Sequence, residues 1–237
     1  MKTHSLFLPL AVMVMAAFFA ITVWQEKTLE LYAAPGYSTE IVQLPQPRFD
    51  SGTSVEKALH GRRSVRDYRD EPLTLAEIGQ LLWAAQGVTA PGGLRTAPSA
   101  GALYPLELSV VAGKVSGLAP GIYRYRPQSH TLRPLLPGDR RGELCDAALR
   151  QSAIRKAPAS LVFSAVFART TGKYGERGVR YVYMDHGHAA ENVYLQAVAL
   201  NLGTVVIGAF NDDAVRLAAS LPVEEKPLSI MPIGRSK

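Results

Sequence analysis

The stretch that most constrains the fold is "VRYVYMDHGHAAENVYLQAVALNLG", residues 179–203. Its spacing predicts one long helix over about 179–201, closed at Gly203. Apolar and small residues occupy nearly every side of that helix, which is typical of a helix covered all round by other elements. We therefore expect a central, buried helix, and the rest of the chain must supply the layers that cover it.

Two further helices are predicted before this one. "TSVEKALHG" offers a capping box from Thr53 to Glu56 and a glycine stop at Gly61. "TLAEIGQLLWAAQG", residues 74–87, repeats the pattern, and its apolar residues fall on one helical face. Both segments are expected to be surface helices with one buried side.

Strands are predicted by runs rich in β-branched and aromatic residues. Three such runs come before the long helix and two after it, with one helix expected over about 140–151 and another starting at 211–213. The predicted strands are 106–113, 121–127, 159–166, 204–210 and 228–234. The pattern indicates a single α+β domain over residues 51–237.

The N-terminus is a separate region. Residues 6–24 are uncharged and long enough to cross a bilayer as a helix. An uncleaved membrane anchor over residues 1–24 is favoured, and a cleaved secretory signal remains the alternative. Residues 25–50, rich in proline, are expected to be an extended linker. Lys2 and the α-amino group place the domain on the outer face of the membrane, although the cytoplasmic face stays open.

Composition excludes several classes of protein. The net charge of +6 is scattered, with no basic run interleaved with aromatics, so nucleic-acid binding is not expected. The single cysteine, Cys145, excludes an internal disulfide framework and a cysteine-based metal cluster. His186 and His188 are two positions apart and point to different faces of a helix, so they are expected to pack or to hydrogen-bond, and no metal site is predicted.

One short basic segment, "HGRRSVRDY" at residues 60–68, suggests an anion site. In extended backbone Arg62, Ser64 and Arg66 project to the same side, with Arg63 beside them. Two guanidiniums and a hydroxyl that converge on one spot suit a phosphate group. A basic surface turn would have the same sequence, so spacing alone leaves both interpretations open.

Four segments taken together resemble a known family. They are "RRSVRDY", "PSAGALYPLEL" at 98–108, the run from "KYGERG" to "VVIGAF" at 173–210, and "PIGR" at 232–235. In this order they are similar to the nitroreductase superfamily of FMN-dependent oxidoreductases, and within it to the SagB-type dehydrogenase branch. The resemblance implies an α+β fold with a central, mostly antiparallel sheet flanked by helices. It also implies a homodimer with FMN at the subunit interface.

The resemblance also assigns cofactor contacts. It implies that one segment holds the FMN phosphate and polar flavin edge, that a loop from the partner subunit passes beside the ring, and that a strand end lines the ring face. An ordinary turn at residues 98–101 and a surface cation at residue 235 are the alternatives. The implied residues are Arg62, Arg63, Ser64 and Arg66 in the first group, Pro98, Ser99, Ala100 and Gly101 in the second, Ile207, Gly208 and Ala209 in the third, and Arg235 as a further phosphate ligand.

Lys173 and Tyr174 match a Lys-Tyr pair that the SagB-type branch uses as the base in substrate oxidation. A lysine whose pKa is lowered near a flavin could accept the proton, and the tyrosine could orient it. "GKYGERG" could equally be an exposed loop with ion pairs to Glu176 and Arg177. The family works by ping-pong exchange, here on a small-molecule or peptide substrate with NAD(P)H as a possible donor. The alternative is a non-catalytic, membrane-anchored accessory protein on the same fold.

Overall fold

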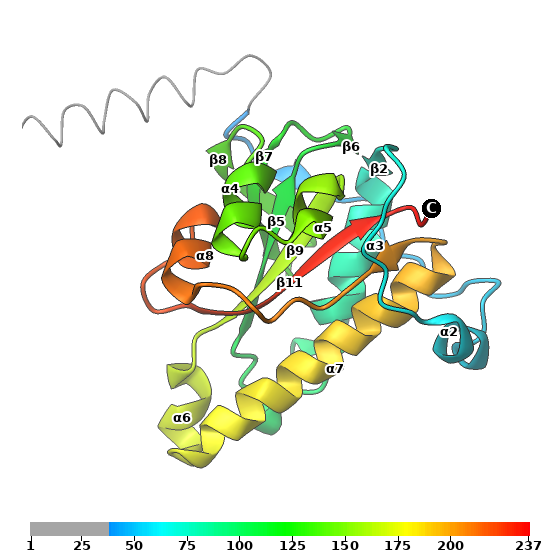
Figure 1. Cartoon of the computed structure of the whole chain (residues 1–237). Coiled ribbons are helices and arrows are strands. Elements are labelled where there is room, and N and C mark those ends of the chain that lie inside the picture. The colour runs from blue at the N-terminus through cyan, green and yellow to red at the C-terminus, as the bar shows by residue number, and fades with distance from the viewer. Residues whose placement is uncertain (1–37) are drawn as a thin grey trace, which may run out of the picture.

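The computed structural model of the protein describes residues 38–237, and its centre is a seven-stranded sheet (Figure 1). All pairs of neighbouring strands in this sheet are antiparallel, in the order β1-β8-β7-β5-β9-β11-β10, which confirms the predicted mostly antiparallel sheet. Its strands are β1 (Val42–Gln43), β5 (Leu106–Ala112), β7 (Gly121–Arg126), β8 (Thr131–Pro137), β9 (Ala159–Ala165), β10 (Gly203–Thr204) and β11 (Lys226–Gly234). Two small pairs complete the strands: β2 (Leu73–Thr74) with β6 (Val115–Ser116), and β3 (Val88–Ala90) with β4 (Leu94–Arg95).

Helices cover both faces of the sheet. Successive side chains of a strand point to opposite faces of the sheet, so neighbouring residues of β5 pack in different hydrophobic cores. Leu108 and Val110 pack in one cluster with α3 and α7, whereas Val111 packs in a second cluster with α4, α5 and α8. The helices are α2 (Val55–Gly61), α3 (Leu75–Gln86), α4 (Arg141–Ala147), α5 (Ser152–Lys156), α6 (Ala168–Tyr174), α7 (Arg177–Ala199) and α8 (Asp212–Ala218), with a 3-10 turn η1 (Ala100–Ala102).

Helix starts follow local capping chemistry. Thr74 and Glu77 form the predicted capping box of α3: each side chain bonds to the backbone of the other. In α2 the cap is Ser54, whose hydroxyl accepts from the Lys57 N–H, so the predicted box from Thr53 is wrong by one residue. Asn211 caps α8 as its sequence predicts.

Helix α7 departs from the predicted central burial. It runs diagonally along one side of the molecule in Figure 1, and its inner face packs Val182, Ala189 and Val193 against the sheet layer. Its other side is open in the single chain, where Tyr183 is 56% exposed and Met184 is 52% exposed. The prediction of complete burial is therefore wrong for one chain alone.

Two other predicted elements differ from the structure. The expected strand over 204–210 reduces to β10 and one isolated bridge from Ile207 to Ile230. The expected helix over 140–151 shortens to α4, because Leu149 and Arg150 take left-handed backbone angles that a helix cannot contain, and α5 begins after them at Ser152. Strand β8, which the sequence analysis does not predict, pairs with β7 beside β1.

The predicted N-terminal hydrophobic helix over 1–24 lies outside the described residues, as does part of the 25–50 linker. Among residues 38–237 no helix has both the length and the apolar character needed to cross a membrane. Membrane attachment and the side of the membrane stay predictions from the sequence.

Candidate active site

The segment that follows α2 runs in extended backbone beside β10. The Val65 N–H donates to the Thr204 carbonyl at 2.9 Å, and Ser64 bridges Thr204 in parallel. Side chains alternate along such a segment, so Arg62 and Ser64 point the same way. Both reach Tyr194 of α7: the Arg62 guanidinium lies 5.2 Å from the ring centroid, and the Ser64 hydroxyl lies 3.2 Å from the tyrosine oxygen.

The other two arginines of the segment lie elsewhere. Arg63 folds back, and its guanidinium donates to the carbonyls of His60 at 3.1 Å and Arg62 at 2.6 Å. Arg66 is exposed and forms no hydrogen bond or ion pair with any residue of the described range 38–237. The predicted convergence therefore holds for Arg62 and Ser64, while Arg66 is not brought to Tyr194.

Tyr194 is a site residue that the sequence analysis missed. Its hydroxyl accepts a hydrogen bond from the Val206 N–H at 2.8 Å, next to the predicted flavin-facing residue Ile207. Ile207 itself is buried, whereas Gly208 and Ala209 are exposed. No local signal in the sequence marks Tyr194, because Asn192 and Gln196 make the same stretch of α7 polar as well.

A cavity of about 520 Å³ lies beside this segment, and Tyr194 forms part of its wall. Its charged lining is entirely cationic and consists of Arg63, Arg69, Arg235 and Lys237. The Arg235 guanidinium forms ion pairs with the carboxylates of Glu77 at 2.9 Å and Glu71 at 3.3 Å. A cavity with four cations in its wall and no carboxylate suits an anionic group such as a phosphate.

The predicted flavin-side loop is anchored to another part of α7. Asp185, only 4% exposed, accepts from the Ser99 hydroxyl at 2.6 Å and from the Ala100 N–H at 3.3 Å. The Ser99 oxygen in turn accepts from the Tyr104 N–H at 2.9 Å. Asp185 was also missed, because α7 carries a second carboxylate, Glu191, and only the structure shows that Asp185 is the buried one.

Gly101 lies at the centre of this loop and touches the predicted catalytic pair. Its φ is +63°, and a β-carbon at this position would lie 2.6 Å from the Tyr174 hydroxyl and 3.0 Å from the Lys173 Nζ. Two neighbours that do carry β-carbons, Ala102 and Tyr104, also have positive φ values, of 53° and 46°. Such backbone is strained, and strain of this kind is concentrated at functional sites.

The Lys-Tyr pair lies at the end of α6. The Lys173 side chain is exposed, and the Tyr174 ring meets the Tyr181 ring edge-on at 5.1 Å. The alternative interpretation expected ion pairs to Glu176 and Arg177, and Lys173 and Tyr174 form neither within the described part of the chain. The pair is instead beside Gly101, 72 positions earlier in the sequence than Lys173.

The site residues thus form two clusters on one helix. Tyr194 marks the basic cluster and Asp185 the loop cluster, nine positions apart on α7. At 1.5 Å per residue this separation is about 14 Å along the helix.

His186 of α7 hydrogen-bonds and packs against the sheet. The His186 Nε2 lies 2.7 Å from the Ser229 hydroxyl, and its ring meets Phe163 edge-on, which fits the predicted packing role. Burial lowers the pKa of His186 to about 4. No group of three or more metal-ligating side chains occurs among the residues that the structure describes.

The fold is an antiparallel sheet covered by helices, with a cavity lined by cationic side chains and a strained loop at a Lys-Tyr pair. Residues 59–235 match the nitroreductase family, and the chain belongs to this family of oxidoreductases. Proteins of this family generally bind FMN and are commonly homodimers. A nitroreductase-family protein of Methanocaldococcus jannaschii is 48% identical over 181 residues, which is 76% of this chain and 90% of the relative.

Two further relatives place the chain within the family. A nitroreductase-family structure from Anabaena variabilis aligns with a TM-score of 0.74 and 30% identity, over 84% of this chain and 42% of that one. The microcin B17-processing protein McbC of Escherichia coli is 28% identical over 63% of this chain. The chain spans 57% of McbC, and it aligns with the Escherichia coli microcin synthetase McbBCD complex with a TM-score of 0.64.

Proposed function

We propose that the protein is an FMN-dependent dehydrogenase or reductase that works by ping-pong exchange, close to the SagB-type branch. One observation carries this proposal: the loop of residues 98–104 places Gly101 directly against Lys173 and Tyr174. The small residue lets backbone approach the pair closely, and its φ of +63° favours glycine. Similarity to McbC supports the choice of branch.

The basic cluster fits the phosphate of FMN. Arg62 and Ser64 converge on Tyr194 beside a cavity whose charged lining is cationic, so guanidinium and hydroxyl donors are available to phosphate oxygens. When bound, FMN supplies two-electron redox chemistry, and the protein contributes binding, orientation and electrostatics. Arg235, held by Glu77 and Glu71, adds a fixed positive charge to the same cavity.

Lys173 and Tyr174 are the proposed acid–base pair. In the role we assign, the Lys173 amine accepts the proton that a substrate loses when it is oxidised, and the Tyr174 hydroxyl orients that proton. An amine close to the substrate can serve as a general base once its pKa is near the working pH. The closeness of both side chains to Gly101 supports this assignment.

A homodimer would complete the site. The two clusters lie about 14 Å apart along α7, and the helix exposes Tyr183 and Met184 on its outer side. We propose that a second copy covers this side and that each loop of residues 98–101 serves the basic cavity of its partner. In the reductase direction NAD(P)H is the proposed electron donor and a small molecule accepts the electrons. In the dehydrogenase direction a small molecule or a peptide is oxidised, by analogy with the truncated pro-MccB17 bound in the McbBCD structure, and a separate electron acceptor reoxidises the FMN.

The proposal is tested by an absorbance spectrum of the purified full-length chain after FMN is added and the excess is removed. We expect a retained flavin spectrum with shifted bands that dithionite bleaches. A folded protein that retains no flavin would overturn the enzyme proposal and favour the accessory protein.

Single variants then test the assigned roles. Arg62→Ala should weaken FMN binding about tenfold to a hundredfold, the effect of losing a charge-assisted hydrogen bond. Arg133→Ala is the matched control, because Arg133 is exposed on β8 away from the basic cavity. Lys173→Ala should retain FMN and lose substrate oxidation. Unchanged flavin affinity in the first variant, or full activity in the last, would refute that assignment.

A further inference from the structure

A second, smaller cavity lies beside β5, the strand that follows the loop of residues 98–104. Its volume is about 190 Å³, and it is formed by the end of α3, by β4 and β5, and by the turn after β7. Most of its lining is polar or charged. The charged and amide side chains in the wall are Gln86, Arg95, Glu107, Arg126, Gln128 and Arg169.

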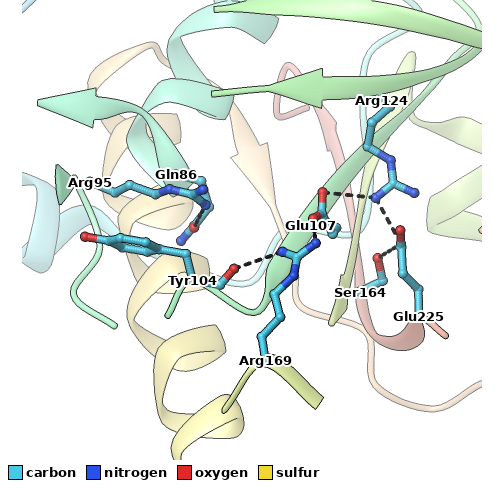
Figure 2. A network of polar contacts seen from close by, with 8 residues as sticks. All are labelled: Gln86, Arg95, Tyr104, Glu107, Arg124, Ser164, Arg169 and Glu225. Atoms are coloured by element: carbon cyan, nitrogen blue, oxygen red, sulfur yellow. Dashed lines mark hydrogen bonds and ion pairs between the residues drawn. The ribbon is translucent and has the colours of Figure 1, made fainter. Parts of the chain in front are cut away.

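The carboxylates near this cavity already have cationic partners, as Figure 2 shows. Glu107 pairs with Arg169 at 2.6 Å and with Arg124 at 3.5 Å. Arg124 also pairs with the buried Glu225 at 2.9 Å, and that carboxylate accepts from the Ser164 hydroxyl at 2.6 Å. The positive charges of Arg124 and Arg169 are therefore neutralised by the carboxylates of Glu107 and Glu225.

Two other arginines in the wall have no carboxylate partner among residues 38–237. Arg126 is exposed and forms no ion pair there. Arg95 donates once, to the Gln86 side-chain oxygen at 2.7 Å, and its guanidinium lies 4.4 Å from the centroid of the Tyr104 ring (Figure 2). Its Nε is fully buried and has no hydrogen-bond partner.

An unpaired, partly buried guanidinium is unfavourable unless a counter-charge arrives. Burial lowers the pKa of Arg95, and the nearby carboxylate of Glu107, which is already paired with two other arginines, offsets only part of this effect. The ring of Tyr104 and the amide of Gln86 nevertheless hold the guanidinium plane in one orientation. The side chain is therefore fixed in place with most of its donors unused.

We propose that this cavity binds a small oxyanion, a carboxylate or a phosphate, between Arg95 and Arg126. A planar guanidinium pairs with two oxygens of either group at once. The volume of 190 Å³ is below the ~300–1,000 Å³ of pockets for larger ligands, so only a small anion or the anionic end of a longer molecule fits. The site shares no residue with the proposed FMN contacts and stands independently of that proposal.

The oxyanion site would lie next to the strained loop. Tyr104, which stacks on Arg95, is the residue at which the loop returns to the strand β5, and its carbonyl accepts from Arg169 at 3.1 Å. Substrates or regulators that carry a carboxylate or phosphate could thus be recognised next to the loop that contacts the Lys-Tyr pair.

The test is calorimetric titration of the purified full-length chain with sodium acetate, with inorganic phosphate and with sodium chloride at matched ionic strength. FMN is kept in excess so that its own phosphate site is occupied. We expect saturable heat from acetate or phosphate and none from chloride, and the anion that binds identifies the chemistry. Equal responses to all three salts, or no response, would overturn the proposal.

Variants locate the site. Arg95→Gln should weaken the binding of the oxyanion at least tenfold, and Arg126→Gln, an exposed change that leaves the core intact, should weaken it as well. Arg133→Gln removes the same charge from an exposed position outside the cavity and should have no effect. Arg62→Ala should lower the affinity for FMN and leave the affinity for the oxyanion unchanged. If Arg133→Gln weakens binding as much as Arg95→Gln does, the cavity is not the site.

Discussion

The contact between Ser99 and Asp185 offers the sharpest test of how the loop is held. The Ser99 hydroxyl donates to the Asp185 carboxylate at 2.6 Å, and the Ala100 N–H donates to its other oxygen at 3.3 Å. Asp185 forms no ion pair within the described chain, so these donors are what compensates its buried charge. We predict that the two side chains are strongly coupled.

The magnitude follows from the chemistry of the contact. A hydrogen bond to a charged group contributes about 1.5–3 kcal/mol to the free energy of unfolding. Ser99→Ala should therefore lower that free energy by about 2 kcal/mol, because the hydroxyl is lost to Asp185 and to the Tyr104 N–H. In a double-mutant cycle with Asp185→Ala, the coupling energy between the two sites should be about 1.5–3 kcal/mol.

Urea unfolding of the wild-type protein, both single variants and the double variant measures this coupling. Ser109→Ala is the matched control, since the Ser109 hydroxyl is fully buried in β5 and has no hydrogen-bond partner. Its removal should be neutral or stabilising. A coupling energy below about 0.5 kcal/mol, the level at which separate sites are additive, would refute the argument that Asp185 holds the loop through Ser99.

Three further predictions use other parts of the molecule. Gly101→Ala should abolish substrate turnover, because it adds a β-carbon that clashes with the Lys-Tyr pair. The control Gly117→Ala, at φ +82° with open space around it, should lower only the stability of the fold. Turnover assays and urea unfolding separate the two effects. Glu225→Ala should lower the free energy of unfolding by about 3–5 kcal/mol, because the buried Arg124 guanidinium loses its closest carboxylate partner. The pKa of His186 falls from 6.5 in the unfolded chain to about 4 in the folded protein. Between these two values the unfolded chain binds a proton that the folded protein does not, so the free energy of unfolding should decrease as the pH falls from 6.5 to 4. His186→Gln should flatten this decrease, measured as urea midpoints at each pH, and an unchanged slope would contradict the prediction.

Local chemistry accounts for the elements that were predicted well. Residues 106–113, 121–127 and 159–166 became β5, β7 and β9 because β-branched and aromatic side chains suit a pleated, buried surface. The capping box at Thr74 fixed the start of α3 within the sequence itself. Residues 204–210 have the same composition, but their partner is β11, which they meet only at β10 and at Ile207. Composition does not determine that register.

In the candidate site, too, features set by the local sequence were predicted and features set by tertiary contacts were not. Alternation along an extended segment correctly placed Arg62 and Ser64 together. Tyr194 and Asp185 were missed because their importance depends on what lies opposite them, and those partners come from 130 positions away in the first case and 86 in the second. Helix α7 carries other charged and polar residues as well, so neither side chain stands out in the sequence, and only the tertiary structure shows which contact each one makes.

Helix α7 connects the sequence pattern to the assembly. Apolar and small residues on nearly every side predicted full burial, yet the single chain covers one face and leaves Tyr183 and Met184 more than half exposed. The pattern and the structure agree if a second copy covers the open face, because burying large apolar side chains lowers the free energy by about 1.5–3 kcal/mol each. Tyr183→Asp should then shift the protein from dimer to monomer in analytical ultracentrifugation. The monomer should also lose FMN, because each basic cavity would lack the loop that its partner supplies. A dimer that persists in this variant with full flavin content would show that the interface lies elsewhere.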